Sequence, residues 1–249
     1  MSRAKVLTTE VQDKIAGEYG SIKAKDLAEK YSCTIDQVYE VAKRRKLTQR
    51  HNKIVNLSYL QEQIIFGGLL GDGRLKRNGR NNYYYSECHA LGESDYLRWK
   101  FNSLGELTSG HNIYPKNNNL KDVSDALEFT TLTTPSLKKY VDMSKLDIIK
   151  QLDELGLIIY LLDDGWLNSN TKLGNLTITT YPLTSDEREA LHRQWKKIAD
   201  ISFHNSGIKR VNSSTSSKNT QAILKLVLKY IPKDTDVVKK KFKNVIANV

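Results

Sequence analysis

IIFGGLLGDGRL at residues 64–75 and LIIYLLDDGWL at residues 157–167 are the two stretches that indicate the fold most clearly. Each has an apolar segment of helical length that ends in an aspartate followed by glycine, so Asp72 and Asp164 end two matching segments. The residues after each aspartate are predicted to form the same order of structural elements. The pattern therefore predicts two copies of one half, each contributing a carboxylate.

Hydrophobic periodicity and turn residues outline both halves. In the first half we expect a helix over 60–71, a turn-rich segment, a strand over 83–90, a helix over 92–105, strands over 111–116 and 125–134, and a helix over 134–143. In the second we expect a helix over 152–163, a strand over 174–181, a helix over 183–200, a hairpin of 201–204 with 208–214, and a helix over 217–231 that Pro232 stops. We assign each half the order helix, two strands, helix, two strands, helix, although only one strand of the first pair is located in either half.

Composition favours a polyanionic partner. The chain has 249 residues and a formal net charge of +11, and nucleic acid is the commonest polyanion that a strongly basic protein binds. A merely soluble basic protein remains the alternative. Only Cys33 and Cys88 are present, far apart, so the sequence suggests neither a zinc site nor a disulfide framework, and a reducing compartment is the default expectation. The first residues lack a signal-peptide core and the apolar runs are too short to cross a bilayer, so we expect a cytoplasmic location at intracellular DNA, no secretion and no membrane contact.

Residues 1–48 are predicted to form a small helical unit. Thr8 or Thr9 can cap a first helix, Ser21 or Ile22 opens a second, and Thr34 caps a third in which Ile35, Val38 and Val41 form the apolar face. Two short helices joined by a tight turn resemble a helix-turn-helix, whose third helix here would enter the major groove. Its basic end would then lie against phosphates through Lys43, Arg44 and Arg45. An ordinary three-helix packing unit is the alternative. A basic linker is expected next, over 49–56.

The two glycine- and aspartate-ended helices, their separation by about one αββαββα unit and the LLDDG form of the second one resemble the LAGLIDADG homing endonuclease family in its monomeric two-motif form. The resemblance implies an α+β fold: a duplicated αββαββα domain over 57–249, with halves at about 57–144 and 145–242 and antiparallel saddle-shaped sheets that bind DNA. It further implies a monomer that cuts a long, asymmetric double-stranded DNA site with Mg²⁺ or Mn²⁺.

Physical chemistry supports a metal site at the motif ends. Helices that pack closely need small residues, which Gly67, Gly68 and Gly71 supply, whereas the second helix has bulky residues at 158–160 and makes the interface asymmetric. Such packing brings Asp72 and Asp164 together, and two adjacent carboxylates repel each other unless a cation lies between them. Hard divalent metals bind carboxylate and phosphate oxygens together. The alternative is that both Asp-Gly pairs simply terminate buried helices.

By resemblance, Asp72 and Asp164 are the metal-binding acids, one for each DNA strand, and the backbone carbonyls of Gly71 and Asp163 are additional ligands. The family also places a basic residue near each active site. The best matches are Lys139 in the first half, with Lys138 beside it, and Lys241 in the second, with Lys239 and Lys240 as competitors.

DNA contacts are expected on the strands, because their side chains alternate between the two faces of a sheet. In the strand over 83–90 the smaller, more apolar set at 84, 86, 88 and 90 is assigned inward. The DNA-facing set of this strand is then Tyr83, Tyr85, Glu87 and His89. In the strand over 174–181, the residues expected to face DNA are Asn175, Thr177 and Thr179. In the segment over 201–204, Ile201 and Phe203 are assigned inward and His204 outward. The basic turn residues Arg74, Lys76, Arg77 and Arg80 precede the first reading strand and suit guanine contacts.

Two functions of different class are compatible with these features. The first is a Mg²⁺-dependent, site-specific DNA endonuclease whose double-strand break spreads a mobile intron, intein or free-standing gene. The second is a binding protein on the same scaffold, either a transcription regulator or an RNA-splicing maturase. An acid at the end of both motifs favours the enzyme, since a pure binder has little use for two carboxylates near phosphate.

Overall fold

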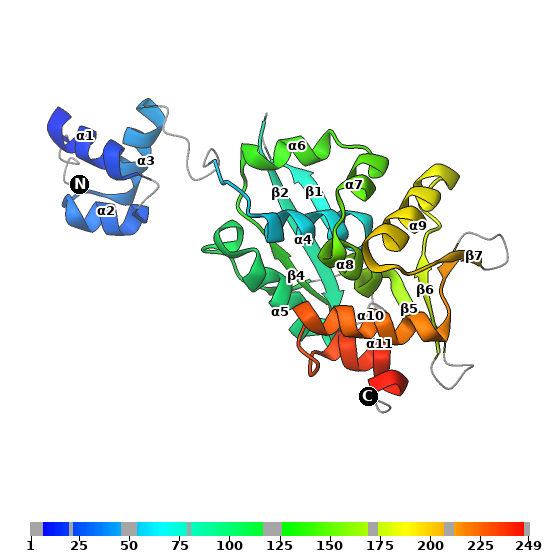
Figure 1. Ribbon diagram of the computed structural model, residues 1–249. Coiled ribbons are helices and arrows are strands. Elements are labelled where there is room, and N and C mark those ends of the chain that lie inside the picture. The colour runs from blue at the N-terminus through cyan, green and yellow to red at the C-terminus, as the bar shows by residue number, and fades with distance from the viewer. Residues whose placement is uncertain are drawn as a thin grey trace.

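The computed structural model describes residues 7–19, 22–45, 54–78, 81–116, 126–168, 174–206 and 212–246 (Figure 1). The N-terminal helices are α1 (Thr9–Glu18), α2 (Ala24–Lys30) and α3 (Ile35–Arg44). The first half contains α4 (Tyr59–Leu70), β1 (Arg74–Arg77), β2 (Tyr83–Ala90), α5 (Ser94–Ser103), β3 (Tyr114–Lys116), β4 (Ala126–Thr130) and α6 (Lys138–Val141). After α7 (Lys145–Gln151), the second half contains α8 (Glu154–Asp164), β5 (Gly165–Asn168), β6 (Asn175–Thr179), α9 (Ser185–Ala199), β7 (His204–Ser206), β8 (Asn212–Ser214), α10 (Ser217–Tyr230) and α11 (Asp236–Ile246).

The first three helices have a small core of their own. The Thr8 side chain accepts a hydrogen bond from the N–H of Val11, and Thr34 forms a capping box with Gln37, as the sequence predicts. Val38 and Val41 are buried, but Ile35 is 41% exposed, so the predicted apolar face was wrong at its first position. Lys23 stands at the start of α2 without a side-chain cap, in place of the predicted Ser21 or Ile22. Most of the predicted linker over 49–56 lies outside the described residues.

Two antiparallel four-stranded sheets confirm the α+β duplication. The strand order is β1-β2-β4-β3 in the first sheet and β5-β6-β8-β7 in the second. Arg74 pairs with Ser86 in the first sheet, and Trp166 pairs with Thr177 in the second, so the second residue after each motif aspartate holds the same place in its ladder. The sequence pattern missed β1 and β5, which directly follow the two motif aspartates. It also missed α7 and α11.

Helices α4 and α8 pack against each other at the centre of the main domain (Figure 1). Residues 155–162 of α8 are all buried, which explains why its sequence is apolar on every side. A Cβ added to Gly67 would lie 2.5 Å from the carbonyl oxygen of Gly156 and 2.7 Å from the Cβ of Ile159. Gly67 is therefore required for the close approach of the two helices.

Not every motif glycine serves this interface. Gly71 faces Asp163 across it, but Gly68 faces the ring of Tyr85 in its own half. The second helix contributes a small residue of its own, Gly156, which lies against Gln63. The prediction that the first helix alone supplies the glycines was therefore wrong. Within the described residues, no helix combines the length and the apolar character that a membrane span requires.

Candidate active site

The packing of α4 against α8 brings the two motif ends together. A Cβ on Gly71 would lie 2.5 Å from the Cβ of Asp163, so the residues before Asp72 and Asp164 are in van der Waals contact across the interface. Burial, followed by the negative charge of Asp72, raises the pKa of Asp164 to about 6. Burial also raises the pKa of Asp72, whose side chain is 41% exposed, while His89 opposes the shift. The two acids thus share one electrostatic site.

Lys241 of α11 lies at the same place. Its ammonium donates to the backbone carbonyls of Gly165 and, at 3.4 Å, of Asp163. Burial lowers the pKa of this lysine, and Glu93 and Asp163 act in the opposite direction. The structure therefore brings Lys241 to the end of the second motif. It also places a cation on the Asp163 carbonyl that the resemblance implied as a metal ligand.

The corresponding expectation for the first half was wrong. Lys139 lies on α6 and pairs with Glu62 at 2.8 Å, near the N-terminal end of α4 and about ten residues, or roughly 15 Å of helix, before Asp72. Its side chain is 61% exposed and its ammonium lies over the ring of Tyr140. The lysine that reaches the motif ends from the first half is instead Lys100 of α5, a residue that the sequence pattern did not indicate.

Lys100 is fully buried between two carboxylates. Its ammonium lies 2.6 Å from Oδ1 of Asp163 and also contacts Oε1 of Glu87. The Tyr96 hydroxyl donates to Oδ1 of Asp163 at 3.0 Å, and the Tyr85 hydroxyl donates to Oε2 of Glu87 at 2.7 Å. The 2.6 Å separation makes the contact of Lys100 with Asp163 an ion pair. Burial raises the pKa of Asp163 to about 7, and Lys100 opposes that shift. A cation from the first half thus neutralises an acid of the second motif helix.

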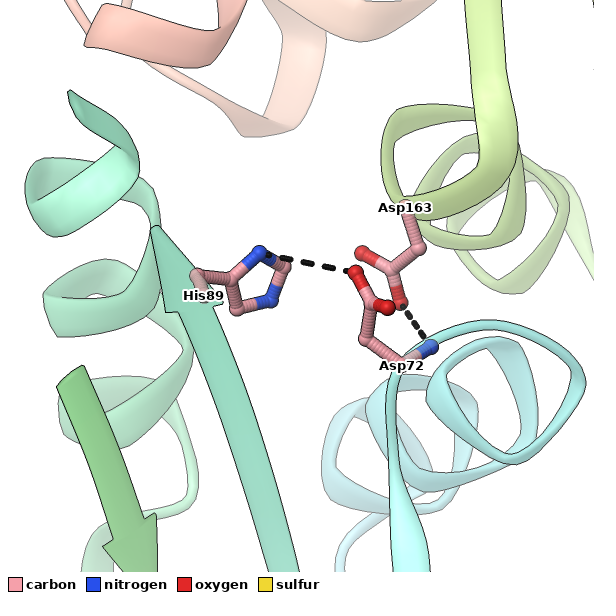
Figure 2. A group of neighbouring side chains, drawn as sticks. All are labelled: Asp72, His89 and Asp163. Atoms are coloured by element: carbon pink, nitrogen blue, oxygen red, sulfur yellow. Dashed lines mark hydrogen bonds and ion pairs between the residues drawn. The ribbon is translucent and has the colours of Figure 1, made fainter. Parts of the chain in front are cut away.

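His89 faces the carboxylate of Asp72, which lies beside Asp163 (Figure 2). Its Nε2 lies 2.9 Å from Glu87, and its Nδ1 lies 3.2 Å from Glu93 and 3.6 Å from Oδ2 of Asp72. Hydrogen bonds to carboxylates on both ring nitrogens raise the pKa of His89 to about 10, despite its burial. An imidazolium has no free lone pair for a metal. Although Asp72, His89 and Asp163 have ligand atoms within 4.8 Å of one another, His89 therefore acts as a cation there.

The donor set at the motif ends fits a hard divalent cation. Asp72 and Asp164 present carboxylates from two helix ends, and their mutual repulsion is relieved by a positive ion between them. Asp163 is less suited to this role, because Lys100 and Tyr96 already occupy its carboxylate. The donor chemistry therefore favours Asp72 and Asp164 over the Asp72, His89 and Asp163 group.

The faces of β2 are the reverse of the sequence prediction. Tyr85, Glu87 and His89 are at most 4% exposed and point toward the helices, and Tyr83 packs on the core beside them. The open face of the sheet instead carries Ser86 and Cys88, with Arg74, Lys76, Lys116 and Glu128, around a hollow of about 190 Å³ that Asp72 also lines. The error arose because polar Glu87 and His89 were taken for surface residues, whereas Lys100 and the tyrosine hydroxyls satisfy them inside.

The other predicted contacts divide by position. Arg74 and Lys76 are exposed on β1 itself, not in a turn before the first strand. Arg77 lies one residue further along β1, so its side chain belongs to the other face of the sheet. Arg80 lies outside the described residues. In β6, Leu176 and Ile178 are buried as predicted, which leaves Asn175, Thr177 and Thr179 on the open face. Thr177 is nevertheless covered by Ser214 through a 2.8 Å hydrogen bond. Ile201 and Phe203 are buried and His204 is exposed, also as predicted.

Cations also collect at the end of α3. Arg44 and Lys43 lie 3.8 and 4.0 Å from Glu40, and Arg45 pairs with Asp13. All three basic side chains are exposed, at 81%, 72% and 42% for Lys43, Arg44 and Arg45. Tyr39, 44% exposed, lies on the same helix.

A duplicated fold whose central helices bring two carboxylates together beside two antiparallel sheets defines the homing-endonuclease class. The chain belongs to the LAGLIDADG DNA endonuclease family, whose model matches residues 62–222. The solved structure of the homing endonuclease I-WcaI bound to its DNA recognition sequence has the same fold, with a TM-score of 0.61 and 19% identity over 83% of this chain and 92% of that one. The family and the fold class predicted from the sequence are thus confirmed.

Two curated relatives are similar over about half of the chain. The DNA endonuclease I-ChuI of Chlamydomonas applanata is 30% identical over an alignment of 143 positions that covers 48% of this chain and 65% of that protein. A RecA protein of Mycolicibacterium flavescens is 30% identical over an alignment of 122 positions that covers 47% of this chain and 28% of that protein. The chain therefore spans less than two thirds of the length of these relatives.

Proposed function

We propose that this protein is a site-specific double-strand DNA endonuclease that uses a divalent cation held by Asp72 and Asp164. The observation that carries the proposal is the convergence of two motif-end acids at one helix interface, where burial and mutual repulsion raise the pKa of Asp164 to about 6. The net charge of +11 supports a polyanionic substrate. Family membership supports DNA as that polyanion.

The two sheets provide the DNA-binding surface in this proposal. The open face of the first sheet presents Arg74, Lys76 and Lys116, which suit phosphates and guanine edges. The matching place in the second sheet presents Trp166, 42% exposed, in register with Thr177. Because the two halves carry different chemistry, the site they recognise is asymmetric.

The residues at the motif ends have different roles in the proposed cleavage reaction. Asp72 and Asp164 would hold the cation, Mg²⁺ or Mn²⁺, which when bound supplies Lewis-acid stabilisation of the charge that develops on the phosphate. Lys241 adds a fixed positive charge beside the second motif, held by the carbonyls of Asp163 and Gly165. The ion pair of Lys100 with Asp163 keeps the acid next to Asp164 from adding a second unbalanced negative charge.

Selection from a library of long duplexes tests the proposal. The full chain is incubated with the library in Mg²⁺, and cut ends are captured and sequenced. We expect one long asymmetric site to be enriched with breaks in both strands. Tight, sequence-specific binding without cutting in Mg²⁺ or Mn²⁺ would identify a non-cleaving DNA-binding protein instead.

Lys241 and Lys139 provide a matched pair of variants. We expect Lys241→Met to slow cleavage by about 10²-fold, because a nearby cation that stabilises transition-state charge contributes roughly 3 kcal/mol. Lys139→Met removes the same charge from an exposed ion pair and should leave the rate within about twofold. Single-turnover cleavage at saturating enzyme measures both. Equal rates for the two variants would remove Lys241 from the mechanism.

We propose that residues 1–48 form a second DNA-binding unit in which α3 contacts the duplex. Replacing Tyr39 by alanine, which leaves the capping box of Thr34 and Gln37 intact, should weaken binding by about tenfold, as expected for the loss of a base contact worth roughly 1–3 kcal/mol, and leave cleavage at saturating enzyme unchanged. A gel-shift titration and a nuclease footprint measure this. An unchanged footprint and affinity would identify the three helices as a packing unit.

A further inference from the structure

Asp72 and Asp164, which would hold the same cation, are themselves held differently by the protein. The N–H of Asp72 donates to Oδ2 of Asp163 at 3.4 Å, and its Oδ2 lies 3.6 Å from His89 (Figure 2). Both contacts belong to one buried network, because Asp163 and His89 are joined through Lys100 and Glu87. Asp72 is therefore held at its backbone and faced at its carboxylate by the same set of side chains.

No equivalent network surrounds Asp164 among the described residues. The ladder registers place Leu176 where the first half has Tyr85, Ile178 where it has Glu87, and Thr180 where it has His89. Gly71, which immediately precedes Asp72, stands where the second motif has Asp163. Within the part of the chain that the structure describes, no side chain hydrogen-bonds the Asp164 carboxylate. At these places the second half has two apolar side chains and Thr180, whose hydroxyl lies 3.3 Å from that of Ser213, and no charged group.

The network is also rigid. Asp163, Lys100 and Glu87 have fully buried side chains, and His89 is 1% exposed. A buried carboxylate is stable only where its charge is paired and its oxygens are hydrogen-bonded, so each member fixes the positions of the others. The N–H of Asp72 has its acceptor on this fixed group. Asp72 is thus preorganised by side chains that are not themselves ligands of the proposed cation.

We propose that Asp163 and Lys100 are positioning residues that hold Asp72 ready for cleavage, and that the two strands are therefore cut in a fixed order, with the strand served by Asp72 cut first. The inference rests on the proposed nuclease function. It extends that function by making the two acids unequal and by naming the residues responsible.

Asp163→Asn is the variant of choice. Asparagine keeps the shape of the side chain and removes its charge, and Lys100 retains Glu87 as a partner. With one oxygen left for Lys100 and Tyr96, asparagine turns an N–H₂ group toward the N–H of Asp72 and no longer accepts from it. Lys100→Met is the second variant: it leaves the buried Asp163 without its cation, whereas Glu87 keeps His89. Gln63→Leu is the control, since Gln63 is equally buried in the same interface but bonds Gln151 and Asp153.

Cleavage is measured on a duplex with a different label on each strand. The wild type should cut one strand about tenfold faster than the other. Asp163→Asn should slow that faster strand by about tenfold and leave the slower one within twofold, and Gln63→Leu should keep the wild-type ratio. Equal slowing of both strands, or an unchanged ratio in a folded Asp163→Asn protein, would overturn the proposal. A wild type that cuts neither strand would instead refute the nuclease function itself.

Binding gives a readout that needs no turnover. Duplex binding is titrated with Ca²⁺ in place of Mg²⁺. The Ca²⁺ concentration that gives half-maximal duplex binding should rise several-fold in Asp163→Asn and Lys100→Met and stay unchanged in Gln63→Leu. If Lys100→Met does not fold, the Ca²⁺ titration of Asp163→Asn alone tests whether Asp72 depends on this network. Wild-type Ca²⁺ dependence in Asp163→Asn would show that Asp72 does not depend on this network.

Discussion

Replacing Asp72 or Asp164 by asparagine is expected to abolish double-strand cleavage. Each change removes a negative ligand from a shared cation and should cost about 4 kcal/mol of transition-state stabilisation, or roughly 10³-fold in rate. Asparagine has nearly the same shape as aspartate, and in Asp72→Asn it also removes the negative charge that, after burial, raises the pKa of Asp164. Folding and DNA binding should therefore be retained. Strand-resolved cleavage in Mg²⁺ and a gel-shift titration measure the two effects separately.

Asp142→Asn is the matched control, because Asp142 is an exposed aspartate at the C-terminal end of α6. It should cut at the wild-type rate. If either motif variant cut as fast as this control, the aspartate concerned would be a helix terminator without a catalytic role. If both variants lost DNA binding together with cleavage, the acids would be needed for the fold or the complex and not specifically for chemistry.

Gly67→Leu is expected to have the largest effect on stability. A Cβ at this position would already lie 2.5 Å from the carbonyl oxygen of Gly156, so a leucine side chain must push α4 and α8 apart. Overpacking of this kind costs about 3 kcal/mol or more where backbone is the obstacle. For a domain of this size that corresponds to a decrease in Tm of roughly 6–12 °C. Thermal unfolding monitored by circular dichroism measures the decrease.

Gly92→Ala tests whether the loss is specific to the helix interface. Gly92 lies between β2 and α5, and an added Cβ there meets no atom within 4 Å. This variant should keep the wild-type Tm within about 2 °C, the range of a neutral surface change of about 0.5 kcal/mol. A Gly67→Leu protein as stable as Gly92→Ala would contradict the close approach of α4 and α8.

The motif helices were predictable from sequence because their apolar residues and Asp-Gly ends are local signals. Strands β1 and β5 were not. The sequence of β1 is RLKR, whose basic composition is more typical of a turn than of a strand. It is extended because it pairs with β2. Likewise GWLN directly follows a helix and becomes β5 by pairing with β6. Local preference is overridden in both cases by a ladder that forms between segments distant in sequence.

The candidate site shows the same division between local and tertiary information. Asp72 and Asp164 are found from the repeated motif. The inward direction of Glu87 and His89 is not, because it depends on Lys100, which reaches them from α5 and has no recognisable spacing to either. Lys241 was found by resemblance, although α11, which carries it, was not predicted as a helix. Lys139 was wrong because α6 packs at the opposite end of α4.

Anomalous scattering from Mn²⁺ in crystals of the full chain bound to its duplex would locate the cation itself. We expect a peak within bonding distance of carboxylate oxygens of both Asp72 and Asp164, with Asp163 still paired to Lys100. A peak bound by His89 and Asp163 with Asp164 free, or no peak at the motif ends at all, would contradict a cation shared by the two motif aspartates.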